Sequence, residues 1–199
     1  MNRNIAQESD SVRFPTDVVF LSNTALGDGM DSSLTPAQLR LFEHLREFRF
    51  DENGVALPFH ERLARENGWS IGFTARAISE YRRFVFLAMV AGHPVTPSDQ
   101  VDQVWHLHLL YTKSYWNRLC GDVLGRPLHH EPTTGGLSES HKFAGWYART
   151  LESYRRIFQE DPPGDIWPAA RIRFGEDVHF QRVNTHRAWV VAKPWRSFR

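Results

Sequence analysis

The sequence lacks several features that identify common classes of protein. It has one cysteine in 199 residues, which excludes an internal disulfide framework and any zinc finger built on several cysteines. No stretch approaches the roughly 18 consecutive apolar residues that predict a membrane-spanning helix, and the longest, Phe84–Ala91, is much shorter. The first ten residues are polar and contain no apolar signal-peptide region, so we expect a cytoplasmic protein that does not associate with membranes.

The sequence also has no excess of positive or negative charge. The chain carries 24 basic and 23 acidic residues, a net charge of +1, so nothing in the overall balance indicates a nucleic-acid-binding protein. The apolar content is ample, at 41% of residues, and includes seven Trp and fourteen Phe. Because large aromatic side chains bury much area each, a chain of this length and composition predicts a single domain with a substantial core.

Apolar residues recur at helical spacing along most of the chain. Thr35–Gln38 has the form of a capping box, Thr74 and Ser98 are suitable N-cap residues, and Gly125 ends a helix that follows Thr112. We therefore predict an all-α fold, a single compact domain of five or six helices. The expected helices run from about 35 to 49, 60 to 67, 75 to 91, 98 to 111, 113 to 124 and 138 to 159.

These helices define the expected domain organisation. Residues 1–34 form an irregular N-terminal arm, residues 35–168 form the helical domain, and residues 169–199 form a basic C-terminal strap packed on that domain. The segment 75–91 is apolar nearly all round, which predicts the central buried helix.

The basic tail offers a candidate partner-binding surface. Its aromatic and basic residues are Trp189, Trp195, Arg187 and Arg196. They could stack on and neutralise a nucleic acid or an acidic partner, or the aromatic rings could dock on the helices while the arginines stay in solvent. The neutral charge of the whole chain favours docking and makes nucleic acid the less expected partner.

Four of the ten histidines lie between residues 106 and 130, close to the single cysteine. Imidazole, thiolate and carboxylate ligands suit zinc or another transition metal. Residues two apart on a helix point about 200° away from each other, so His106 and His108 cannot bind one ion within a regular helix. Asp102 precedes His106 by four residues, so it is either a ligand or a carboxylate that orients the imidazole.

The sequence therefore predicts a metal site, with zinc as the favoured ion. Its expected ligands are His106, Cys120 and His129, with His108 or His130 as an optional fourth and Asp102 orienting them. Three protein ligands would leave room for a water and for hydrolytic or redox chemistry, and four would make the site structural. In the alternative interpretation the histidines only pack, within a non-enzymatic module that binds a protein or small-molecule partner. A nucleophilic role for Cys120 is disfavoured, because it lies towards the end of its helix.

The same segment resembles the glycine-rich domain-containing protein-like family, which includes plant proteins with glycine-rich regions and shorter bacterial proteins. The resemblance covers roughly residues 69–136. It implies an all-helical domain with a site centred on histidine and cysteine, and it implies no particular reaction. This chain has no glycine-rich tail and no RNA-binding module, so no RNA-related role is implied. The residues that carry the resemblance are Asp102, Trp105, His106, His108, Tyr115, Cys120, Gly125, His129 and His130, with Tyr81–Phe84 upstream.

Overall fold

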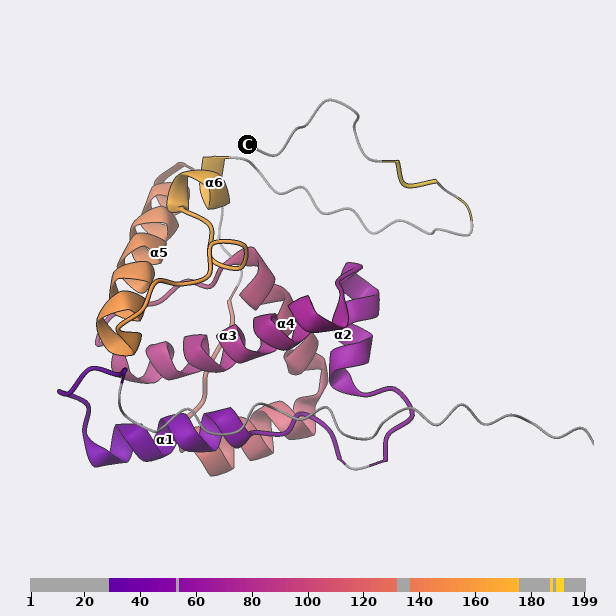
Figure 1. Ribbon diagram of the computed structural model, residues 1–199, viewed down its shortest axis with the longest axis horizontal. Coiled ribbons are helices and arrows are strands. Elements are labelled where there is room, and N and C mark those ends of the chain that lie inside the picture. The colour runs from indigo at the N-terminus through magenta and orange to yellow at the C-terminus, as the bar shows by residue number, and fades with distance from the viewer. Residues whose placement is uncertain (1–28, 53, 132–136, 176–186, 188, 192–199) are drawn as a thin grey trace, which may run out of the picture.

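The computed structural model describes residues 29–52, 54–131, 137–175, 187 and 189–191. These residues form seven helices and no strand, which confirms the predicted all-α fold (Figure 1). No helix among them is long and apolar enough to cross a membrane. The helices are α1 (Pro36–Glu47), α2 (Phe59–Asn67), α3 (Ile71–Val90), α4 (Asp99–Leu110), the π-helix η1 (Lys113–Leu124), α5 (Leu137–Phe158) and α6 (Ala170–Gly175).

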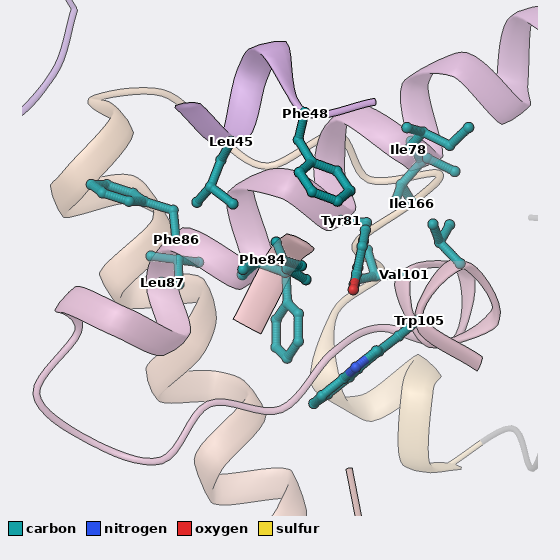
Figure 2. Close-up of a cluster of buried hydrophobic side chains, with 14 of the residues drawn as sticks. Leu45, Phe48, Ile78, Tyr81, Phe84, Phe86, Leu87, Val101, Trp105 and Ile166 are labelled. Carbon is teal, nitrogen blue, oxygen red and sulfur yellow. The ribbon is translucent and has the colours of Figure 1, made fainter. Parts of the chain in front are cut away.

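Helix α3 is the centre of the fold. It crosses the middle of the molecule in Figure 1 and contacts α1, α2, α4 and α5. Its buried residues lie on several sides of the helix, as the nearly continuous apolar segment predicted. Figure 2 shows Tyr81 and Phe84 of this helix next to Trp105 of α4, within one cluster of buried side chains. This packing holds α4, the helix with the two histidines, firmly against the core.

The caps explain where the helices begin. The capping box at the start of α1 is present, with Thr35 and Gln38 each accepting a hydrogen bond from the other's backbone. Helix α3 begins one turn earlier than expected, because Ser70 accepts from the backbone N–H of Phe73 at 3.2 Å. The expected N-cap, Thr74, lies inside the helix and donates its hydroxyl to the Ser70 carbonyl at 2.9 Å. Two hydroxyl residues four apart were both suitable caps, and the first one adds a turn to the helix.

The predicted helix 113–124 is present as a π-helix, η1. It ends at Gly125, whose φ of 66° lies in the left-handed region that glycine adopts without strain. A π-helix bonds residue i to residue i+5, so residues five apart lie close to each other. This wider turn brings Cys120 near the phenol of Tyr115, which lowers the pKa of its thiol against the larger, opposite effect of burial.

Two segments far apart in the sequence attach to α5. The backbone N–H of Asp31 donates to the Ile157 carbonyl at 2.9 Å, and the Asp31 carboxylate pairs with Arg156 at 3.3 Å. Helix α6, which lies within the predicted strap and was not expected as a helix, also packs against α5. The boundaries of the arm, the helical domain and the strap stay predictions, since much of 1–34 and 169–199 lies outside the described residues.

Candidate metal centre

Three side chains with metal-binding chemistry gather at one end of the histidine segment. Asp102, His106 and His130 each offer a ligand atom, and these atoms all lie within 4.8 Å of one another. Asp102 and His106 are one turn apart on α4, and His130 comes from the loop that follows η1. Across the part of the chain that the structure describes, this is the one group of three such ligands found.

One pair within the group is hydrogen-bonded, and the other is within ion-pair distance. Nε2 of His130 donates to Oδ1 of Asp102 at 2.8 Å, and Nε2 of His106 lies 3.6 Å from Oδ2 of the same carboxylate. The two imidazole rings have centroids 4.6 Å apart. The side chains of Asp102 and His130 are 19% and 17% exposed, whereas that of His106 is 51% exposed. The cluster is therefore lined by protein on one side and open to solvent on the side of His106.

Buried aromatic residues hold the loop that carries His130. Nε1 of Trp105 donates to the hydroxyl of Tyr115 at 2.9 Å, and that hydroxyl donates to the carbonyl of Leu128. The ring of Trp105 also meets the His130 ring at a centroid distance of 4.4 Å and an angle of 63°. Because the Leu128 carbonyl is two residues before His130, this chain of hydrogen bonds fixes the backbone that presents the imidazole.

His108 faces away from the cluster, as its position two residues after His106 predicts. It is fully buried, with Nδ1 3.0 Å from the Tyr81 hydroxyl and Nε2 3.1 Å from the Ser114 hydroxyl. Burial, together with the positive charges of Arg118 and Arg82, lowers the pKa of His108 to about 3. It is a neutral core imidazole with both nitrogens engaged, so the structure does not bring it to the site as a fourth ligand.

Cys120 and His129 also lie outside the group of three. Cys120 is buried. Burial raises the pKa of its thiol, and the Leu128 backbone and the Tyr115 side chain oppose part of this effect. His129 is exposed, and its ring lies 5.7 Å from that of Trp116. The predicted combination of His106, Cys120 and His129 is thus not assembled, and Asp102 and His130 are the residues beside His106.

Part of this arrangement was accessible from the sequence. The four-residue spacing of Asp102 and His106 placed them on one face of a helix, and His130 was among the candidates. The preference for His129 over its neighbour could not be corrected from the sequence, because the Trp105 and Tyr115 contacts that orient the loop are tertiary.

The predicted partner-binding residues lie only partly within the described chain. Trp189 is 96% exposed and Arg187 is exposed, whereas Trp195 and Arg196 lie outside the described residues. Docking of the tail on the helices and a binding role for it both stay predictions.

Comparisons with known proteins match the region that holds the cluster. The model of a protein family described as UCP032817-like matches residues 43–145, about half of the chain and all three clustered residues. Glycine-rich domain-containing proteins 2 and 1 of Arabidopsis thaliana are 25% identical over 108 and 109 residues, which is 51% of this chain in each case. The matched region spans only 13% of either plant protein. No solved structure matches the chain.

Proposed function

The chain belongs to the UCP032817-like family, and we propose that it is a metal-binding protein whose site is formed by Asp102, His106 and His130. The observation that carries this proposal is the convergence of three ligand atoms within 4.8 Å, from a helix and from a separate loop. The resemblance to glycine-rich domain-containing proteins is confirmed by the plant relatives, and it leaves the activity of the domain undefined.

The chemistry of the three side chains favours zinc. Two imidazoles and one carboxylate form a set of ligands that occurs in catalytic zinc sites, where a fourth position is left to water or substrate. The same set also suits non-haem Fe²⁺. The open position would lie on the side of His106, where the side chain is half exposed. An ion bound there supplies Lewis-acid chemistry.

The distances support an ion between these residues after small movements. Two ligand atoms on a tetrahedral zinc ion with bonds near 2.0–2.1 Å lie about 3.3 Å apart. The Asp102–His130 separation of 2.8 Å is shorter than this, and the Asp102–His106 separation of 3.6 Å is slightly longer. The two distances end on different oxygens of the Asp102 carboxylate, so an ion held by one of these oxygens would require the carboxylate to rotate. The ion would then replace the Nε2 proton of His130, as is usual when imidazole binds a metal.

Surrounding residues would prepare the site for an ion. The Trp105 ring packs against the His130 ring in a T-shaped contact, and a histidine held by such a contact keeps its orientation at little entropic cost. Asp102 is only 19% exposed, which strengthens its interaction with a cation. In the competing interpretation Asp102 and His130 are a structural hydrogen-bonded pair, in a module that binds a partner without metal.

Elemental analysis of the purified, untagged full chain separates these interpretations. The proposal expects about one equivalent of a transition metal in the wild type, and its loss in Asp102→Ala, His106→Ala and His130→Ala. His129→Ala and Cys120→Ser are matched controls from the same segment, and both should keep the metal. Wild-type protein that stays metal-free after incubation with zinc and removal of the excess would overturn the proposal, as would loss of the ion in Cys120→Ser alone.

A further inference from the structure

Three consecutive apolar residues after α6 are exposed to solvent. Trp189, Val190 and Val191 are 96%, 73% and 80% exposed, and Figure 1 draws them in yellow, well away from α5 and α6. Single apolar residues are common on protein surfaces, but a contiguous run that includes a tryptophan is typical of a segment that docks on another surface. The proposed metal site does not involve this segment.

A cavity of about 440 Å³ lies between α5 and the segment that leads into α6. Its lining is mostly apolar: Leu151 and Trp167 are 8% and 2% exposed, and Ala148, Ala169 and Ala170 add to the apolar surface. Cavities of about 300–1,000 Å³ with such linings accept small organic groups. The cavity therefore suits an apolar side chain or a small apolar ligand.

Contacts with the core hold one wall of the cavity in place. Nε1 of Trp167 donates to the carboxylate of Glu80 at 2.8 Å, and the Trp167 ring stacks on that of Tyr147 at a centroid distance of 6.1 Å. An apolar group that enters the cavity meets this wall already formed, so little ordering of the protein opposes binding.

The rim of the cavity carries one carboxylate without a counterion. Asp161 pairs with Arg155 at 2.7 Å, whereas Glu152 is exposed and forms no ion pair within the part of the chain that the structure describes. The cavity is thus complementary to an occupant that combines an apolar ring with a nearby cation. Trp189 and the exposed Arg187, two residues before it, provide this combination.

The exposed segment is tethered beside the cavity. Ala170 lines the cavity and begins α6, a helix of six residues that ends at Gly175 and is about 9 Å long. The chain from Gly175 to Trp189 can reach about 45–50 Å when extended, so Trp189 can return past α6 to the cavity. A tether of this kind supplies an effective concentration in about the millimolar range, which favours the chain's own segment over that of a second copy.

We propose that the Trp189 side chain docks in this cavity of its own chain. The structure describes the tryptophan and the cavity apart, and docking removes apolar area of both from water. The tail is then a strap that closes over α5, with Arg187 brought near the acidic rim. The proposal does not depend on the metal site.

Disulfide trapping in the full chain tests the docked arrangement. Cys120→Ser removes the natural cysteine, and Ala169→Cys with Val190→Cys places one thiol in the cavity lining and one beside Trp189. A disulfide requires Cα atoms within about 4.4–6.8 Å of each other, so rapid closure within one chain, with oxidised glutathione as the oxidant, is the expected result. Arg171→Cys in place of Ala169→Cys is the matched control, because Arg171 is exposed, lies nearer to Val190 along the chain and does not line the cavity.

Adding Trp189→Ala to the trapping pair should slow closure at least about tenfold, the factor that burial of a large apolar side chain supplies. Three results would overturn the proposal: closure unaffected by Trp189→Ala, closure equally fast in the Arg171→Cys control, or bridges that form only between two chains. The last result would assign the cavity to the segment of a second copy. The four substituted positions other than Cys120 are exposed, and circular dichroism of each reduced variant confirms that it is folded.

Discussion

His106 and His108 lie two residues apart on α4 and have opposite environments. The His106 side chain is 51% exposed and lies beside the carboxylate of Asp102. His108 is fully buried, with one nitrogen near the Tyr81 hydroxyl and the other near the Ser114 hydroxyl. The two histidines of this helix therefore have different roles: His106 is a candidate metal ligand at the surface, and His108 is a buried polar residue of the core. Substitutions at the two positions should have opposite consequences.

His106→Ala should abolish metal binding and leave the fold almost unchanged. The side chain is half exposed and fills no core space, so the free energy of unfolding should change by no more than about 0.5 kcal/mol. Urea unfolding with a chelator present measures this value without the contribution of a bound ion. A loss of several kcal/mol under these conditions would show that His106 stabilises the core.

His108→Phe should destabilise the fold and leave metal binding intact. The replacement keeps most of the ring volume but leaves the buried hydroxyls of Tyr81 and Ser114 without their partner. At about 1–3 kcal/mol for each of the two unsatisfied buried groups, the expected loss is about 2–6 kcal/mol. The same urea unfolding with a chelator measures it. Metal content equal to that of the wild type is the second expectation, and loss of the ion from folded His108→Phe would contradict the assignment.

Tyr115→Phe tests whether the loop before His130 is held from the core. The change removes the acceptor for Trp105 Nε1 and the donor to the Leu128 carbonyl. We expect a loss of about 1–3 kcal/mol in the free energy of unfolding, and weaker metal binding in a competition titration with a chromophoric chelator. Trp116→Phe is a control on the same helix, since Trp116 is partly exposed. An unchanged affinity in Tyr115→Phe would show that the hydrogen bonds stabilise the fold without positioning His130.

Glu80→Gln should change how stability depends on pH. Burial raises the pKa of Glu80 above its ordinary value of 4.5, although Arg83 and the N–H of Trp167 partly oppose this effect. The folded state therefore holds this proton more tightly than the unfolded state. The stability that Glu80 contributes is fully present below about pH 4.5 and is lost as the pH rises through the folded-state pKa.

Gln can still accept from Trp167 and does not ionise. The stability of the wild type relative to Glu80→Gln should therefore fall as the pH rises from 4 to 7, as measured by chemical unfolding at each pH. A difference that is constant across this range would contradict the expected effect of burial. Glu152→Gln, which alters an exposed residue of α5, serves as the control for a general loss of negative charge.

The helices were largely predictable because their signals are local. The capping box at Thr35 and the N-cap at Ser98 act through backbone groups within three residues. The start of α3 was placed one turn late, because Ser70 and Thr74 are equivalent caps until packing selects one. The π-helical form of η1 was not predicted, since apolar spacing indicates that a helix is present but not which hydrogen-bond pattern it has.

The sequence was sufficient to locate the candidate site, but it did not identify all the residues that form it. The helical period correctly separated His106 from His108 and paired Asp102 with His106. Cys120 was favoured on the chemistry of its thiolate, and its burial beside Tyr115 depends on the π-helical turn. The choice between His129 and His130 is made by Trp105, which contacts only the second ring. Such contacts between distant segments are absent from any local pattern.

X-ray absorption at the zinc edge of the zinc-loaded full chain identifies the ligands of the ion. We expect a shell of nitrogen and oxygen ligands at about 2.0–2.1 Å, with the multiple-scattering signature of two imidazoles and no sulfur. In His130→Ala that signature should fall to one imidazole or disappear with the metal, and in Cys120→Ser the spectrum should not change. A sulfur shell at about 2.3 Å, or the six-oxygen shell of hydrated zinc, would contradict a site formed by Asp102, His106 and His130.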